Sequence, residues 1–213
     1  MKHAWAAALA LAAIAAPHAA VAQVFGQFNS AATLPVNGHA FGGYLTASQN
    51  QVGGLAQLRL SFYPDVDFGF HGGLSRLNRG GAGKDITTLR LGTDVRWQLR
   101  RQSAASAVDV SAGAALAVET GDAFKVVTLG PTVVVGRTVG GENGPLAPYA
   151  GLALLFVSRD AFGLRDTDLS LPLRLGLEAR LAPEVRIVAE MQVFIADRFN
   201  DDVGFATGVN LPF

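Results

Sequence analysis

Charged side chains of both signs occur at alternate positions in several stretches of this 213-residue chain. Arg90, Asp94 and Arg96, for example, are separated by two or four residues. Residues two apart in an extended strand share a face, so this spacing brings acids and bases together on one face. Three kinds of chemistry are open to such a face: ion pairing, conduction of ions, and acid–base catalysis.

The elements that must position these charges read as β-strands. Apolar residues fill the intervening positions, as Leu89, Leu91 and Trp97 do, and a helix would need them at three- and four-residue spacing. The clearest strands are 86–100, 108–119, 169–181 and 185–195. Weaker ones are 40–48, 54–63, 66–77, 126–139, 146–157 and 203–213, which makes ten. Eight strands remain an alternative, because the stretches around Ala40 and Val126 alternate poorly.

The first 22 residues read as a cleaved secretory signal peptide. A basic start at Lys2 is followed by roughly 13 apolar residues, fewer than the about 20 that a spanning helix needs, and by a small-x-small site at Ala20–Ala22. No later stretch reaches the length of a spanning helix. A membrane protein with this sequence must then be a closed β-barrel, which satisfies its main-chain polar groups in lipid.

The last strand points to the same environment. Phe205, Val209, Leu211 and Phe213 share one face, and the strand ends on an aromatic residue. This arrangement resembles the C-terminal signal of bacterial outer-membrane β-barrels. The resemblance implies outer-membrane lipid and the barrel assembly machinery as partners. Pro212 departs from the usual pattern, because it lacks an N–H for the ladder.

The chain thus resembles small bacterial outer-membrane barrels of the OmpA-like or porin-like type, with no specific family identified. The expected fold is an all-β, up-and-down antiparallel transmembrane barrel, formed by residues 23–213 as one domain. A soluble barrel alternates too, but with the opposite polarity. Long apolar faces, and opposite faces of glycine, serine and mixed charge, favour the membrane.

Composition excludes some partners and sites. Half of the residues are hydrophobic and cysteine is absent. Of the 17 basic residues only Lys2 lies in the signal peptide, so the mature chain would carry 16 against 17 acidic residues. This balance predicts no nucleic-acid partner. The sequence predicts no cofactor and no metal site, and it does not indicate an oligomeric state.

The connections predict two ends of the barrel. Those at 64–65, 101–107, 140–145 and 182–184 are expected in the periplasm, and those at 49–53, 78–85, 120–125, 158–168 and 196–202 at the cell surface. Phe62, Trp97, Tyr149 and Phe213 lie near periplasmic strand ends and are candidates for an aromatic girdle.

The lumen is expected to hold an ionic network. Its predicted members are Arg59, Asp67, Arg90, Asp94, Arg96, Asp109, Glu119, Arg174, Glu178, Arg180, Arg186 and Glu190. Two cross-strand pairs are suggested, Asp109 with Arg96 and Glu178 with Arg186. Barrels of about eight strands are just filled by side chains, whereas 16 to 18 strands leave a channel, so ten strands favour a filled lumen. Lumen glycines are the argument for residual space; they are Gly92, Gly113, Gly130, Gly176 and Gly208.

Catalysis is not expected. In strand count the chain resembles the omptin surface proteases, whose histidine lies near the outer rim, but His39 and His71 do not. His71 with Ser75 is similar to the histidine–serine pair of outer-membrane lipid A deacylases. Four residues along a strand separate them by about 13 Å, too far for a nucleophile–base hydrogen bond.

Two loops also fail as sites. Residues 79–84 are glycine-rich and end in lysine but lack the phosphate-loop spacing, and the acidic loop ending at 200–202 is too short for an EF-hand.

The predicted function is a non-enzymatic outer-membrane barrel with a filled polar lumen and a structural or surface-interaction role. The alternative is a narrow, porin-like passive channel for small solutes, and a surface enzyme is the least favoured reading.

Overall fold

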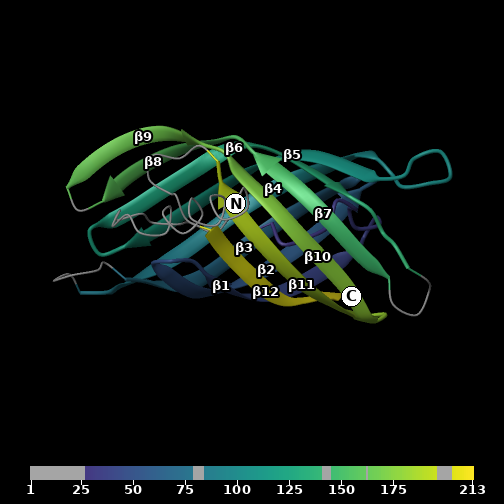
Figure 1. Cartoon of the computed structure of the whole chain (residues 1–213), viewed down its shortest axis with the longest axis horizontal. Helices are drawn as coiled ribbons and strands as arrows, with labels where there is room; N and C mark the ends of the chain where they lie inside the picture. Colours follow the sequence, from purple (N-terminus) through teal and green to yellow (C-terminus); the bar gives the residue numbers. More distant parts are fainter. Residues whose placement is uncertain (1–26, 79–83, 141–144, 162, 196–202) are drawn as a thin grey trace, which may run out of the picture.

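The computed structural model is an all-β barrel, and it describes residues 27–78, 84–140, 145–161, 163–195 and 203–213. Its strands are β1 His39–Ala47, β2 Gln51–Tyr63, β3 Val66–Leu77, β4 Ile86–Arg100, β5 Asp109–Gly121, β6 Phe124–Gly136, β7 Leu146–Ala153, β8 Leu155–Ala161, β9 Leu164–Ser170, β10 Pro172–Ala182, β11 Val185–Phe194 and β12 Val203–Pro212. Each strand pairs antiparallel with its neighbours, and β1 pairs with β12, so the sheet closes on itself (Figure 1).

The barrel has ten strands, because β7–β8 and β9–β10 are each one strand interrupted at a proline, which is Pro131 on the neighbouring β6 in the first case and Pro172 of β10 itself in the second. Leu154, between β7 and β8, donates its N–H to Pro131 O of β6 at 3.0 Å, but Pro131 has no N–H to return. Leu171 O accepts a hydrogen bond from Ile195 N, so the main-chain groups of Leu171 point toward the β11 side. Those of the next residue, Pro172, then point to β7–β8, and Pro172 has no N–H to donate there. The predicted ten-stranded up-and-down barrel is confirmed.

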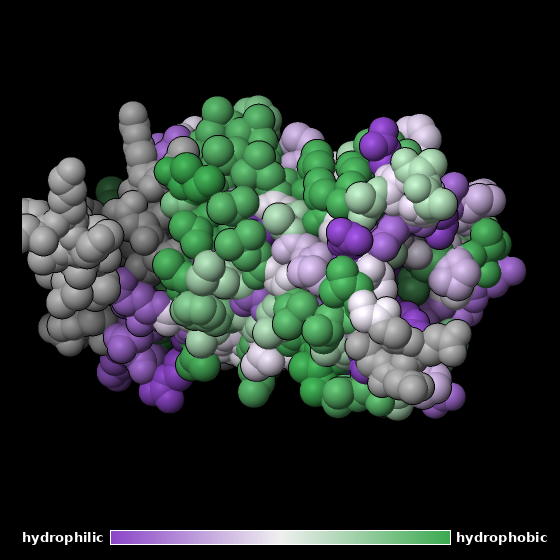
Figure 2. All heavy atoms as spheres, turned by 45° about the vertical axis from the view of Figure 1, so that its right-hand side comes forward, coloured by the Kyte–Doolittle hydropathy of each residue, from purple (hydrophilic) through white to green (hydrophobic). Residues whose placement is uncertain are grey.

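The two faces of the wall have opposite character. Large apolar side chains such as Leu45, Leu91 and Phe156 point outward and are exposed, whereas arginines, carboxylates and amides point into the lumen and are buried. Figure 2 shows the outward apolar residues gathered over the strands, with hydrophilic residues toward the ends. This polarity is the reverse of a water-soluble barrel, where the apolar faces would be inside.

One predicted loop is wrong. Residues 158–168 were expected as a surface loop, but β8 and β9 continue through them as a paired hairpin from Leu155↔Ser170 to Ala161↔Leu164. The ladder here depends on main-chain pairing, which the charged residues of this stretch do not reveal. The expected signal peptide, most of the glycine-rich loop 79–84 and the loop 196–202 lie outside the described residues.

The seam between β1 and β12 accommodates Pro212. Phe213 donates its N–H to His39 O at 2.9 Å, and the two rings stack with centroids 5.5 Å apart. Pro212 therefore directs its main chain to β11, where pairing has already ended at Arg186↔Asn210. Its missing N–H removes no bond from the ladder.

Only part of the predicted aromatic girdle lies on the outward face. Phe62, Trp97 and Phe213 are exposed near the rim that carries the C-terminus, called here the C-terminal rim; the opposite end is the loop rim. Tyr149 is wrong as a girdle residue. It is buried in the lumen, because in β7 the positions Ala147, Tyr149, Gly151 and Ala153 form the inward face.

Residues 27–38 do not join the wall. They run from β1 at the C-terminal rim into the lumen, where Phe28 and Ala31 are fully buried (Figure 1). We call this stretch the N-terminal segment. The sequence did not predict this placement.

Aromatic side chains of the lumen lie flat on glycines of the neighbouring strand. A Cβ added to Gly176 would come within 2.1 Å of the Tyr149 ring, whereas one added to Gly43 would meet nothing within 4 Å. Overpacking of this kind costs about 1–3 kcal/mol. We expect Gly176→Ala to lower the free energy of unfolding in urea by that amount, and Gly43→Ala, the matched control, to change it far less. Equal effects of both variants would contradict the packing described.

Candidate functional site

The half of the lumen next to the C-terminal rim contains a chain of four charges of alternating sign from β2, β3 and β4. Arg59 pairs with Asp67 and donates to both oxygens of Asp94, at 2.6 and 2.9 Å. Arg96 donates to Asp67 at 2.9 Å through Nη2 and at 3.3 Å through Nε. All four side chains are buried, so each charge depends on the others for compensation.

The strand register explains this cluster. Asp67 lies directly opposite Arg96, and Arg59 lies opposite Gly69. The Gly69 position leaves the space into which Arg59 and Asp94 converge, because a Cβ there would be 2.2 Å from Asp94 Oδ2. The glycine is therefore part of the ion-pair geometry.

A second cluster lies nearer the loop rim and centres on Glu119 of β5. Arg90 donates its Nε to Glu119 Oε2 at 3.1 Å and its Nη2 to Gln51 Oε1 at 2.7 Å. Gln51 and Thr88 donate to Glu119 Oε1. The carboxylate thus accepts hydrogen bonds from β2 and β4 at once, which ties β5 to its neighbour β4 and, across β3, to β2.

The third polar group lies on β7, β10 and β11. Glu190 accepts a hydrogen bond from the Tyr149 hydroxyl at 2.8 Å and one from Gln192 Nε2 at 2.6 Å. Arg174 of β10 is fully buried, and its guanidinium donates to Gln27 of the N-terminal segment. The hydrogen-bond partners of both the acid and the base here are neutral groups.

Charged side chains of the wall bind the main chain of the N-terminal segment. Arg96 donates to Ser30 O and, at 3.0 Å, to Ala32 O, while Asp67 accepts from Leu34 N at 3.2 Å. The segment thereby adds hydrogen bonds to two members of the four-charge chain, Arg96 and Asp67.

Amide side chains add further contacts to the segment. Gln98 Oε1 accepts from Thr33 N at 3.0 Å and from Thr33 Oγ1 at 2.8 Å. Asn210 of β12 donates to Phe28 O at 3.2 Å. Two of these three bonds involve main-chain atoms of the segment, and the third depends on the Thr33 hydroxyl.

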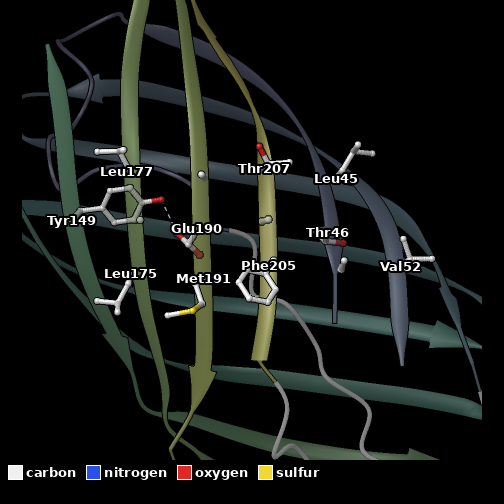
Figure 3. Close-up of a pocket in the computed structure, with 14 residues that line it drawn as sticks. Leu45, Thr46, Val52, Tyr149, Leu175, Leu177, Glu190, Met191, Phe205 and Thr207 are labelled. Carbon is white, nitrogen blue, oxygen red and sulfur yellow. Dashed lines mark hydrogen bonds between the residues drawn. The ribbon is translucent and has the colours of Figure 1, made fainter. Parts of the chain in front are cut away.

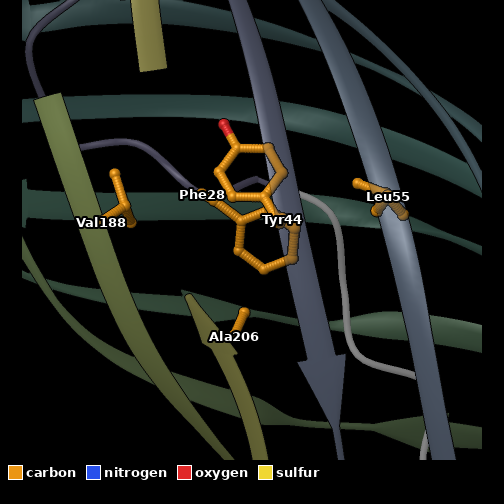
Figure 4. Close-up of a cluster of buried hydrophobic side chains, with 5 residues drawn as sticks. All are labelled: Phe28, Tyr44, Leu55, Val188 and Ala206. Atoms are coloured by element: carbon orange, nitrogen blue, oxygen red, sulfur yellow. The ribbon is translucent and has the colours of Figure 1, made fainter. Parts of the chain in front are cut away.

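One apolar anchor accompanies the polar contacts. Phe28 packs against Tyr44 with ring centroids 4.4 Å apart, and Leu55, Val188 and Ala206 complete the cluster (Figure 4). Four strands, β1 and β2 from the start of the barrel and β11 and β12 from its end, thus meet the segment at one point. Burial of a phenylalanine side chain is worth about 1.5–3 kcal/mol, so Phe28 contributes substantially to seating the segment.

The predicted lumen residues are mostly placed together. Arg59, Asp67, Arg90, Asp94, Arg96, Asp109, Glu119, Arg174, Glu178 and Glu190 are buried, and Arg186 is partly buried. Glu178 and Arg186 form the suggested pair at 2.8 Å. Arg180 lies opposite Arg186 on the same face, but it is exposed at the end of β10, beside a register shift in the β10–β11 pairing, and is not buried with the other predicted residues.

The suggested pair of Asp109 with Arg96 is also wrong. Arg96 lies opposite Gly113, and Asp109 accepts instead from Gln98 Nε2 and Gln102 N, both at 2.8 Å. The pairing was inferred without the β4–β5 register, which shifts between Gln98 and Arg100.

The sequence reasoning missed the neutral members of the network. Gln51, Gln57, Gln98, Gln192 and Asn210 are buried on inward positions. Their positions alternate with outward apolar residues, and this alternation is the sequence signal that indicates inward-facing polar side chains.

The lumen glycines do not provide the residual space expected from the sequence. His71 covers Gly92, Tyr149 covers Gly176 and Tyr44 packs against Gly208. Added Cβ atoms at Gly113 and Gly130 would meet the main chain of adjacent strands. The cavity beside Asn29, Arg59 and Arg96 has a volume of only about 20 Å³, roughly one water molecule.

A groove of about 760 Å³ lies on the outward face, over β1 and β10 to β12 (Figure 3). Leu175, Leu177, Met191 and Phe205 project around it, and Ala189 is the small residue between them. Tyr149 and Glu190, joined by their hydrogen bond, lie behind the wall at this level.

Among the described residues, no group of three or more His, Cys, Asp and Glu side chains is placed to hold a metal ion. None of these residues forms a helix long and apolar enough to cross a membrane. The predicted assembly-signal residues Phe205, Val209, Leu211 and Phe213 lie exposed on the outward face of the last strand and its end.

Comparison with known proteins identifies the fold. An outer membrane channel from Pseudomonas putida F1 superimposes with a TM-score of 0.51 at 9% identity, covering 90% of this chain and 100% of its own. The β domain of the Bordetella autotransporter BrkA gives 0.51 at 12% identity, covering 84% and 100%. No family model and no curated protein matches the chain. The chain has the fold of outer-membrane β-barrels.

The shared carboxylate of Asp67 can be tested by stability. Removal of one partner from a buried ion pair typically costs about 3–5 kcal/mol, whereas an exposed pair contributes less than about 1 kcal/mol. We expect Asp67→Asn to lower the free energy of unfolding in urea by an amount in the first range. Asp85→Asn, which breaks the exposed pair with Arg76, is the control. A loss at Asp67 no larger than at Asp85 would contradict the network.

Proposed function

We propose that this chain is a non-enzymatic outer-membrane β-barrel protein with a closed lumen and a structural or surface-interaction role. The observation that carries this proposal is the filling of the lumen by the paired charges and the N-terminal segment, which leave about 20 Å³ beside Arg59 and Arg96. A solute path requires a continuous polar space, and at this level of the barrel the paired charges and the segment occupy that space.

The polarity of the wall supports placement in the outer membrane. Exposed leucines, valines and phenylalanines cover the outward face, and only lipid is a favourable solvent for such a surface. In this proposal the C-terminal rim lies in the periplasm, the first 22 residues are removed on export, and the barrel assembly machinery reads the Phe213 end. The lipid of the outer membrane is the main partner.

The geometry around His71 supports a role without catalysis. His71 lies over Gly92 and is buried with Ser75 inside the wall, where both are shielded from either rim. The lumen acids and bases form ion pairs, bind the N-terminal segment or, like Glu190 and Asp109, accept hydrogen bonds from neutral groups of the wall.

A second candidate, a narrow passive channel, is favoured by one observation. Residues 39–212 close the barrel through β1–β12 pairing, and the main-chain bonds of the N-terminal segment to the strands lie at its junction with β1, where Asn37 donates to Ser61 O at 2.8 Å and Gly38 O accepts from Ser61 N at 3.0 Å. Departure of the segment would leave the wall intact and would widen the lumen. The two candidates therefore differ in whether the segment leaves.

Electrical recording distinguishes these candidates. Ala31 is fully buried and Ala32, the next residue, is exposed, so arginine at position 31 should expel the segment whereas arginine at 32 should not. We expect the wild-type protein and Ala32→Arg to be silent in planar bilayers, and Ala31→Arg to show discrete ohmic steps. Heat-modifiable gel migration checks that each variant is a folded barrel.

Steady conductance of the wild-type protein would refute the closed lumen and establish the channel. Silence of a folded Ala31→Arg variant would show that the side chains of the wall close the lumen alone. Recovery of the native protein in a soluble periplasmic fraction would refute the outer-membrane placement.

A further inference from the structure

Arg174 holds two oxygen atoms in the manner of a carboxylate receptor. Its Nη1 donates to the main-chain O of Gln27 at 2.8 Å, and its Nη2 donates to Gln27 Oε1 at 3.1 Å. The planar guanidinium fork matches the two oxygens of a carboxylate, and one residue supplies both oxygens here. Gln27 thus occupies the place of a bidentate anion.

The site lacks the anion that a buried arginine normally has. Arg174 is fully buried, yet among the described residues it forms no ion pair within 4.0 Å. Its Nε is buried without a hydrogen-bond partner. Glu190 interacts with Arg174 electrostatically, but from beyond ion-pair distance, so the hydrogen bonds of the guanidinium go to the neutral oxygens of Gln27. A buried charge without a directly bonded counter-ion is a costly arrangement.

The nearest strand carries a carboxylate that is directed elsewhere. Glu190 of β11 is held by the Tyr149 hydroxyl and by Gln192 Nε2, at 2.8 and 2.6 Å. The fork of Arg174 therefore remains open toward the lumen and the N-terminal segment.

A glycine on the adjacent strand makes room for the guanidinium. Gly151 lies opposite Arg174, and a Cβ added there would come within 2.9 Å of Nη2 and 3.0 Å of Nε. The guanidinium therefore lies against the main chain of β7, and only the face toward the lumen is available to a ligand.

We infer that Arg174 is a binding site for a small carboxylate anion, which competes with Gln27 and thereby releases the N-terminal segment from the lumen. This inference rests on the proposed closed lumen. A charged carboxylate forms stronger hydrogen bonds with guanidinium than the neutral oxygens of Gln27 do. The anion and Gln27 cannot occupy the fork of Arg174 at the same time. The anion therefore binds only the state in which the segment has left the lumen, and its binding raises the population of that state.

Labelling of a cysteine placed in the segment tests this competition. The chain has no cysteine, so Ala31→Cys introduces a single thiol at a fully buried position with a small change in volume. The full chain, refolded into phosphatidylcholine vesicles, is treated with a water-soluble maleimide while sodium acetate replaces sodium chloride at constant ionic strength. We expect slow labelling in chloride and a rate that rises with acetate.

Two further substitutions assign the effect to Arg174. In Arg174→Gln the labelling rate should no longer depend on acetate, whatever the labelling rate of this variant in chloride is. Gln27→Glu places a tethered carboxylate on the fork, and should shift the acetate response to higher concentration or remove it. Arg101→Gln, at an exposed arginine paired with Asp65 on the C-terminal rim, should leave the response unchanged.

Equal labelling rates in acetate and chloride would overturn the anion site, provided the denatured protein labels rapidly. An acetate response of Gln27→Glu at the same acetate concentration as in the wild-type protein would overturn it too, even if Arg174→Gln fails to fold. Rapid labelling in chloride alone has a different meaning: the segment then does not fill the lumen, and the proposed function itself fails.

Discussion

Every charge inside this narrow barrel must be compensated by another group inside it, and Asp67 is where that constraint is met. One carboxylate joins Arg59 and Arg96 and also accepts the N–H of Leu34. Its position opposite Arg96 follows from the β3–β4 register. Because an unpaired buried charge is costly, the register, the charges and the N-terminal segment constrain one another.

The small volume of the lumen also constrains where its aromatic residues and glycines lie. Tyr44 and Tyr149 lie inside the lumen only because Gly208 and Gly176 provide flat main chain for their rings. The hydroxyl of Tyr149 then reaches Glu190, so a ring that fills space also satisfies a buried acid. The glycines and the ionic network thus form one packing arrangement, and the N-terminal segment fills what remains.

Much of the wall could be predicted from the sequence, because outward and inward residues alternate strictly in stretches such as 86–100. That parity also identified most lumen charges. Parity could not predict which lumen residues pair with one another, because the partner of Asp109 depends on a register shift in the β4–β5 pairing. It misplaced Tyr149, whose strand alternates alanine, proline and glycine with little contrast. The N-terminal segment has no period at all, and hydrogen bonds to its main chain leave no mark in the side-chain pattern.

The central claim is that residues 27–34 occupy the lumen of the closed barrel. Solid-state NMR of the labelled full chain in lipid bilayers tests it most directly, through the contact between the rings of Phe28 and Tyr44, whose centroids lie 4.4 Å apart. We predict cross-peaks between these two side chains, and their loss in Ala31→Arg. Absence of these cross-peaks, with Phe28 giving the narrow signals of a solvated chain while the strands remain paired, would contradict the account.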